Sequence, residues 1–225
     1  FPIHGINIPA REISGDFYDF YVHNDEIYFT LCDVSGKGVN AGMVMARAIT
    51  LFKIYSKNKF KPNEIHFEMN NDLQQTNPKG VYVTSIIGCY NSKTDIVELS
   101  NAGHLPALFR TNDNFTEYNS SALPLGVKKV DNSNEYKLES FKLEEGRLYC
   151  FTDGYSECRN EKGDEIGIEG VKKLILENNN SSLKKEISKI SKFVEHSSTK
   201  GVNFNTDTSS DNILEDDLTI VGLGK

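Results

Sequence analysis

The chain has 225 residues and a formal charge of -7 at pH 7, because 32 acidic side chains outnumber 25 basic ones. Hydrophobic residues make up 38% of the sequence, which is enough for a core, and the length suits one domain over residues 1–225. The acidic balance and the lack of a basic segment with interleaved aromatic residues argue against nucleic acid as a partner.

The first half of the chain predicts a strand followed by two helices. Residues 26–32 alternate along the chain and place apolar side chains on both faces, as in a buried strand. The glycine-containing turn at 35–38 leads into residues 39–55, where apolar side chains recur at helical spacing. Pro62 then opens a second helical run that ends near residue 75.

The second half predicts more strands and a second pair of helices. Strand-like runs at 81–90, 96–100 and 106–110 suggest a meander, and runs at 136–143 and 147–152 suggest a hairpin. Helices are expected at 168–177 and 183–195, and the last strand at 218–223. The polar tract at 197–212 is expected to be a mobile loop.

Strands grouped in hairpins, with paired helices between the groups, predict an α+β layered domain and not an alternating Rossmann chain. The four cysteines, Cys32, Cys89, Cys150 and Cys158, are widely spaced and form no C-x-x-C pair. They favour buried thiols over a zinc site or a disulfide framework. No run of about 18 apolar residues occurs, so we expect no membrane contact by this domain.

Four aspartates are the candidates for chemistry, because each stands at a strand end or turn beside glycine or another acid. They are Asp16, Asp33, Asp153 and Asp216. Each alone is more readily explained as a helix cap or a loop acid. Carboxylates that converge repel one another and stay ionised together only when a cation compensates them, and hard oxygen ligands suit Mg²⁺ or Mn²⁺.

Other catalytic motifs are excluded, because the residues that they require do not occur at the required spacing. The segment 35–38 lacks the residues that a phosphate-binding loop needs before and after its lysine. Ser35 lacks the flanking glycines of a hydrolase elbow, and the five histidines form no His-x-x-x-His pair for zinc.

Six segments, in order along the chain, resemble the signature blocks of the PPM, or protein phosphatase 2C-like, family. The similarity is to its bacterial branch, that of stage II sporulation protein E and the sigma-B regulators. The segments are Ser14-Gly15-Asp16-Phe17-Tyr18-Asp19-Phe20, Asp33-Val34-Ser35-Gly36-Lys37-Gly38, Asn101-Ala102-Gly103-His104-Leu105-Pro106, Leu123-Pro124-Leu125-Gly126, Phe151-Thr152-Asp153-Gly154-Tyr155-Ser156-Glu157 and Asp216-Asp217-Leu218-Thr219-Ile220.

The resemblance implies a four-layer αββα sandwich of two mainly antiparallel sheets flanked by helix pairs, with a two-metal centre of Mg²⁺ or Mn²⁺. Asp16, Asp33, Asp153 and Asp216 would hold the metals, together with the backbone carbonyl of Val34. The neighbouring acids Asp19 and Asp217 would orient waters or cap a turn.

It also implies a protein serine/threonine phosphatase in which a metal-activated water attacks the phosphate. Arg11 is a candidate to grip that phosphate, and an ordinary surface role for it is equally open. His104 would hold its loop or contact the substrate. The histidine that eukaryotic relatives carry after the second metal aspartate is replaced by Ser35 and Lys37, so the general acid stays open.

The implied substrate is a phosphoserine or phosphothreonine on a signalling protein such as an anti-sigma-factor antagonist. In that branch, activity is governed by dimerisation and by an N-terminal sensor or regulatory domain, which we expect to precede Phe1. The helices over 39–75 would receive its signal. A cytoplasmic location is expected, with a tether to a membrane through the missing region as an option. The alternative is a pseudophosphatase that binds a partner without turnover.

Overall fold

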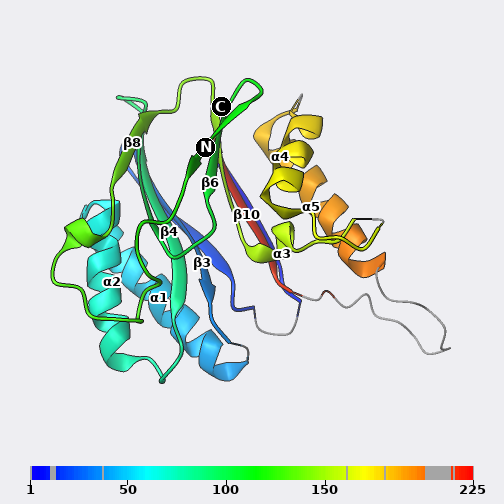
Figure 1. The fold of residues 1–225 in the computed structure, drawn as a ribbon. Coiled ribbons are helices and arrows are strands. Elements are labelled where there is room, and N and C mark those ends of the chain that lie inside the picture. The colour runs from blue at the N-terminus through cyan, green and yellow to red at the C-terminus, as the bar shows by residue number, and fades with distance from the viewer. Residues whose placement is uncertain are drawn as a thin grey trace.

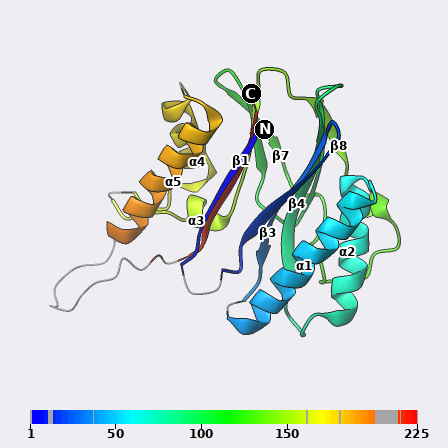
Figure 2. The same cartoon turned by 180° about the vertical axis from the view of Figure 1, so that it is seen from behind.

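The computed structural model describes residues 2–10, 14–36, 38–160, 162–179, 181–200, 214 and 216–224, with the backbone alone at 198–200. Arg11 and residues 201–212 of the tract predicted as a loop lie outside the described residues. The prediction is wrong at residues 197–200, which continue the helix α5 (Leu183–Lys200). Two five-stranded sheets face each other, and a pair of helices covers the outer face of each (Figures 1 and 2). The predicted α+β sandwich of four layers is therefore confirmed.

The first sheet has the strand order β1-β10-β9-β6-β7, and every neighbouring pair is antiparallel. Its strands are β1 (Ile3–Ile8), β6 (Ala107–Thr111), β7 (Asn114–Tyr118), β9 (Arg147–Phe151) and β10 (Leu218–Gly224). The helices α3 (Asp153–Ser156), α4 (Gly167–Asn178) and α5 (Leu183–Lys200) lie on its side of the sandwich, as Figure 1 shows.

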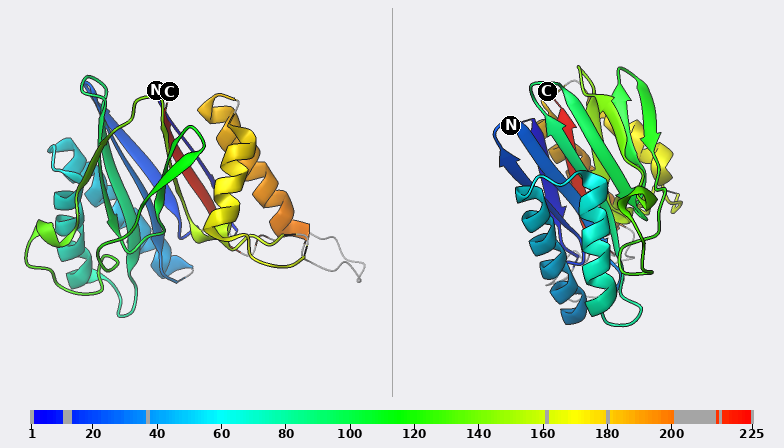
Figure 3. Two further views of the ribbon diagram at one scale, coloured as in Figure 1. Left: turned by 45° about the horizontal axis from the view of Figure 1, so that its top comes forward. Right: turned by 90° about the vertical axis from the view of Figure 1, so that its left-hand side faces the viewer.

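The second sheet has the order β2-β3-β4-β5-β8, and it is also antiparallel. Its strands are β2 (Phe17–His23), β3 (Glu26–Val34), β4 (Val83–Asn91), β5 (Ile96–Ala102) and β8 (Glu139–Lys142). The helices α1 (Val39–Lys57) and α2 (Pro62–Thr76) cover this sheet, as the side view in Figure 3 shows, and a short 3-10 helix, η1 (Ser133–Glu135), follows in the loop before β8.

Local sequence explains where the two long helices on the second sheet begin. Gly36 and Gly38 have φ angles of 96° and 82°, which favour glycine, and α1 starts directly after them. Pro62 occupies the first turn of α2, and the Glu64 carboxylate accepts a 2.8 Å hydrogen bond from the backbone N–H of Lys61. Both helices start where the sequence predicted them.

Two predicted strand pairings are wrong. The proposed meander breaks after β5, because the chain turns at Gly103 (φ 69°) and β6 joins the other sheet. The proposed hairpin does not form, because β8 pairs with β5 whereas β9 lies between β10 and β6. The spacing of residues 136–152 identifies two strands, but a turn of this length can also connect two sheets. Strands β1, β2 and β7 and the short helix α3 were not predicted.

Three apolar layers hold the sandwich together. The layer between the sheets includes Phe29, Leu31 and Val221, and one further layer lies beneath each helix pair. Such burial is the main favourable term in folding. All four cysteines are buried, and no disulfide joins them within the described residues, as expected. In the described residues, no helix combines the length and apolarity needed to cross a bilayer.

A buried histidine links α2 to the second sheet. The ring nitrogens of His66 each lie 3.0 Å from a serine hydroxyl, one on Ser100 and the other on Ser85. The residue is 0% exposed, and burial lowers its pKa from 6.5 to about 3. His66 is therefore neutral in the folded protein at neutral pH.

Acid is expected to destabilise the fold through His66. Between pH 6.5 and about 3 the unfolded chain binds a proton that the folded protein excludes. This contribution to stability is complete above pH 6.5 and falls by about 1.4 kcal/mol per pH unit below it. Urea unfolding over this range should therefore show a steeper loss in the wild type than in a His66→Gln variant. Equal slopes would contradict the assignment.

A buried ion network joins α5 to the first sheet. The Glu186 carboxylate is 0% exposed, and it accepts hydrogen bonds from Arg147 and, at 2.8 Å, from the Tyr149 hydroxyl. The Arg110 guanidinium lies 4.0 Å from the same carboxylate. Removing one partner from such a network leaves buried charge uncompensated.

Replacing Glu186 with alanine is therefore expected to lower the free energy of unfolding by about 3–5 kcal/mol. The matched control is Glu177→Ala, since Glu177 forms only an exposed pair with Lys173 at 3.9 Å, worth about 0–1 kcal/mol. Denaturant titration of both variants measures the difference. A similar loss in the two variants would show that the network adds nothing specific.

Candidate metal centre

The four predicted aspartates come from four chain segments that end at the same side of the sandwich. Asp16 directly precedes β2, Asp33 is the next-to-last residue of β3, Asp153 begins α3 just after β9, and Asp216 lies shortly before β10. In Figure 1 the end of β3, the start of β10 and α3 lie in the lower half of the molecule. The negative charges of these carboxylates raise the pKa values of Asp16 and Asp33, as described below.

Asp16 is the most enclosed member of the group. It is 4% exposed, and within the described part of the chain its buried Oδ2 atom has no hydrogen-bond partner. Burial, and then the charges of Asp33 and Asp217, raise its pKa to about 8, although the hydroxyls of Thr152 and Thr219 act in the opposite direction. A buried carboxylate oxygen without a donor is an open position for a cation.

Asp33 is the member whose pKa responds to the charges of Asp153 and Asp216. Burial, followed by the charges of Asp153 and Asp216, raises the pKa of Asp33 to about 6. Next to it, the Val34 backbone N–H donates a 3.3 Å hydrogen bond to the Gly15 carbonyl. A Cβ atom on Gly15 would lie 3.1 Å from the Val34 carbonyl oxygen, so glycine keeps that carbonyl uncrowded.

Asp153, Glu157 and Asp216 form the second part of the group. One carboxylate oxygen from each lies within 4.8 Å of the others. Glu157 was not predicted as a site residue, although the signal was present in the sequence. Residues four apart in a helical turn share a face, so Glu157 follows Asp153 on the same side.

A close backbone approach brings Asp153 and Asp216 together. A Cβ atom on Gly154 would lie 2.3 Å from the backbone oxygen of Asp217, which no side chain could tolerate. The glycine after Asp153 therefore allows the start of α3 to contact the segment that carries Asp216.

The donor set fits a hard divalent cation. All of the side chains that could bind a metal here are carboxylates, and one of their oxygens, Oδ2 of Asp16, is buried without a hydrogen-bond partner. Because the like charges are crowded, ionisation of the whole set is unfavourable without a cation. Mg²⁺ and Mn²⁺ are cations that such oxygen ligands hold, and each would relieve this repulsion.

Asp217 holds the loop that carries Asp16. Its carboxylate accepts hydrogen bonds from the backbone N–H groups of Ala10 at 2.7 Å and Gly15 at 2.8 Å, and from the Ser14 hydroxyl at 2.8 Å. Ser14 thus contributes a contact of its own to the loop. Asp19 instead pairs with Lys53 of α1 at 2.8 Å.

His104 lies in the layer between the sheets. Its Nε2 atom lies 3.1 Å from the Phe151 carbonyl, so it carries the proton, and its Nδ1 atom accepts from the Thr84 hydroxyl at 2.7 Å. Burial lowers the pKa of His104 to about 4, so the ring is neutral. Both nitrogens are engaged within the protein, which favours the structural role over contact with the substrate.

Ser35, at the position of the histidine in eukaryotic relatives, fixes the turn after β3. Its hydroxyl accepts a 2.8 Å hydrogen bond from the Tyr82 backbone N–H, and its own N–H donates to the Tyr82 carbonyl at 2.9 Å. Arg11 and Lys37 lie outside the described residues, so their predicted relation to the site stays a prediction.

The arrangement is the fold of a PP2C-type phosphatase domain. Among solved structures, the SiaA-PP2C domain of Pseudomonas aeruginosa superposes with a TM-score of 0.81 over 100% of this chain and 85% of that one, at 14% identity. The PP2C domain of SpoIIE from Bacillus subtilis gives 0.78 over 99% of this chain and 62% of that one, at 17% identity. At such identities the likeness shows the fold alone.

The chain belongs to the family of stage II sporulation protein E (SpoIIE), whose model matches residues 23–224. It is 28% identical to the phosphoserine phosphatase RsbU of Bacillus subtilis over 162 residues, which are 72% of this chain and 48% of RsbU. It is 24% identical to protein IcfG of a Synechocystis strain over 194 residues, 73% of this chain and 30% of IcfG. The chain spans about half of RsbU or less than a third of IcfG. The family expected from the motifs is thereby confirmed.

Replacing Asp217 with alanine is expected to weaken Mn²⁺ binding by about 10–100-fold, because hydrogen bonds behind metal ligands have effects of this size. Asp19→Ala is the matched control. Asp19 is also an aspartate close to Asp16 in the sequence, but its carboxylate forms an ion pair with Lys53. Calorimetric titration with Mn²⁺ compares them. Unchanged affinity in Asp217→Ala, with the fold intact, would remove Asp217 from the support of the site.

Proposed function

We propose that this domain is a metal-dependent protein serine/threonine phosphatase that hydrolyses a phosphorylated signalling protein. The observation that carries the proposal is the convergence of Asp16, Asp33, Asp153 and Asp216, from four segments, around a buried carboxylate oxygen without a partner. The family membership of the chain and the activity named for RsbU support it.

The proposed centre holds two divalent ions, Mg²⁺ or Mn²⁺. Asp16 and Asp33 would bind or bridge them with the Val34 carbonyl, and Asp153 and Asp216 would complete the set, with Glu157 beside them. Such a centre supplies a Lewis acid for the phosphate and an activated water. The structure of RsbX in complex with magnesium is similar to that of this chain, with a TM-score of 0.68.

The residues around the proposed centre hold its ligands in place. Asp217 fixes the Ser14-Gly15 turn and hence Asp16, and Ser35 fixes the turn after Asp33. No covalent nucleophile is required, because the attacking group is water. Arg11 remains our candidate to grip the phosphate, and His104 is proposed to hold the two sheets in register near Asp153.

The biological setting completes the proposal. The substrate class is a phosphoserine or phosphothreonine protein of a partner-switching pathway, such as an anti-sigma-factor antagonist, acted on in the cytoplasm. One catalytic domain over residues 1–225 would be controlled by an N-terminal regulatory region and by dimerisation. No observation on the described residues favours the alternative of a pseudophosphatase, because the four aspartates are all present and brought together.

Asp153→Asn is expected to reduce Mn²⁺-dependent release of phosphate from p-nitrophenyl phosphate by at least about 100-fold, since a metal centre contributes several kcal/mol to the transition state. Asp164→Asn, at an exposed acid outside the carboxylate group, should keep the wild-type rate. A wild type that is inert with Mn²⁺, or an Asp153→Asn variant as active as the wild type, would overturn the phosphatase assignment.

A further inference from the structure

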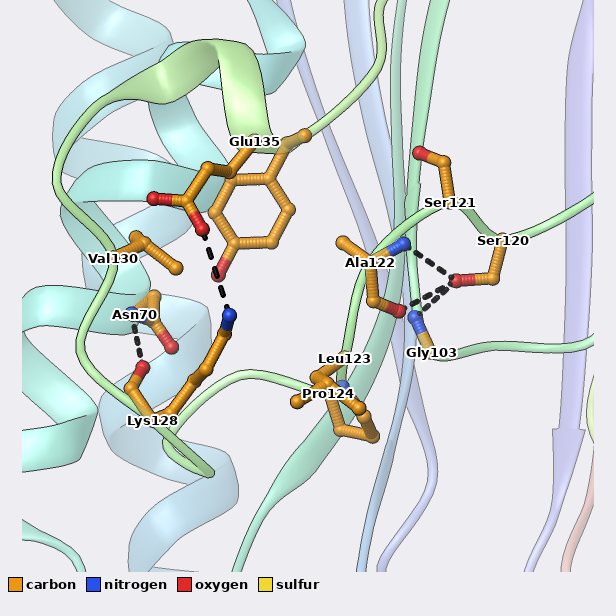
Figure 4. Close-up of a pocket in the computed structure, with 11 residues that line it drawn as sticks. Asn70, Gly103, Ser120, Ser121, Ala122, Leu123, Pro124, Lys128, Val130 and Glu135 are labelled. Atoms are coloured by element: carbon orange, nitrogen blue, oxygen red, sulfur yellow. Dashed lines mark hydrogen bonds and ion pairs between the residues drawn. The ribbon is translucent and has the colours of Figure 1, made fainter.

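A second feature of the fold, separate from the carboxylate group, is a pocket of about 630 Å³ beside α2. Figure 4 shows Asn70 and Lys128 on one side of it and Ser121, Ala122 and Leu123 on the other. The volume is within the range of ligand-binding pockets in proteins. Two of the family-like segments, those with Gly103 and with Leu123 and Pro124, line this pocket, although neither supplies a metal ligand.

The wall of the pocket is preformed. The Asn70 side chain accepts a 2.9 Å hydrogen bond from the Gly126 N–H and donates one of 3.0 Å to the Lys128 carbonyl, which fixes the loop over α2. At the rim, the Lys128 ammonium lies 3.6 Å from the Glu135 carboxylate, as Figure 4 shows. A site held in shape in this way costs little ordering when a ligand binds.

The Tyr136 hydroxyl is a polar group at the pocket. Tyr136 lines the pocket, is 2% exposed and packs its ring against His66 at a centroid distance of 5.4 Å. Across the described ranges of the chain, no hydrogen bond involves the Tyr136 hydroxyl, and this oxygen is not among the buried atoms that lack a partner, so it is open to solvent in the pocket. A hydroxyl that faces a pocket can exchange its hydrogen bond to water for one to a polar atom of a ligand.

The pocket is connected to the candidate metal centre through the ends of strands β3 and β4 in the second sheet. Leu125 and Val83 exchange backbone hydrogen bonds of 2.8 and 3.0 Å, and Val83 is paired in turn with Val34, next to Asp33. Two apolar side chains lie exposed along this connection, Leu123 at 50% and Tyr82 at 40%. An apolar strip therefore leads from the pocket toward the metal ligands.

We propose that this pocket is a specificity subsite of the phosphatase, which accepts an apolar side chain of the phosphoprotein near its phosphorylated residue. The inference rests on the proposed function. A protein chain fits better than a small molecule, because it can fill the pocket and also cover Leu123 and Tyr82 on the way to the metal centre, where a small molecule would leave them exposed. Its backbone or a polar side chain would pair with the Tyr136 hydroxyl.

The test uses phosphoserine peptides with a glycine and alanine host sequence, in which one leucine is moved residue by residue along either side of the phosphoserine. In the wild type with Mn²⁺, leucine at one or two positions should lower KM by about tenfold relative to the host peptide. Ser121→Trp, which blocks the pocket from an exposed position, should abolish this gain and leave p-nitrophenyl phosphate hydrolysis unchanged. Ser140→Trp, at an exposed serine of β8, is the matched control.

Tyr136→Phe gives a second readout, because it keeps the ring and removes only the hydroxyl. It should raise KM for the leucine peptide with little change in kcat. The inference is overturned if no leucine position lowers KM, or if Ser121→Trp and Ser140→Trp act alike on the peptides. A wild type inert toward p-nitrophenyl phosphate would instead defeat the proposed function, and fluorescence anisotropy of the labelled leucine peptide would then decide whether the pocket binds it.

Discussion

The repulsion among carboxylates at one end of the sandwich is the constraint on which the candidate site depends. Burial and mutual charge raise the pKa of Asp16 to about 8 and that of Asp33 to about 6, so the carboxylates by themselves resist full ionisation. The three hydrophobic layers supply the stability that keeps these groups together. In the proposed centre, a divalent cation would turn the same crowding into a set of ligands and so connect the fold with its chemistry.

The backbone meets this constraint through close approaches that only glycine permits. Gly15 leaves the Val34 carbonyl accessible, and Gly154 lets the first turn of α3 contact the chain at Asp217. Asp217 then uses its carboxylate to hold the loop before Asp16, so adjacent acids of the same chain segment have different tasks. The position of each ligand is thus set by a neighbour that does not itself need to bind metal.

The sequence predicted the four layers, both helix pairs and the four aspartates, because these depend on periodicity and on short motifs. It failed where the outcome depends on which sheet a strand joins: β8 and β9 are neighbours along the chain but lie in different sheets. Glu157 was missed because the four-residue helix α3, which brings it to the same side as Asp153, was not predicted, although the spacing of four residues was visible in the sequence. The task of Asp217 was left open because its three donors come from residues about 200 positions away in the sequence.

The two ends of the described chain lie side by side, since β1 and β10 pair along their whole length and the Gly224 N–H donates to the Pro2 carbonyl at 2.8 Å. A short linker could therefore close the chain into a ring, and new ends could be opened at the exposed turn of Asn112 and Asp113. The aspartates would then occur in a different order along the polypeptide and in the same places in space. The geometry of the carboxylate group therefore does not require the order in which its motifs occur along the chain.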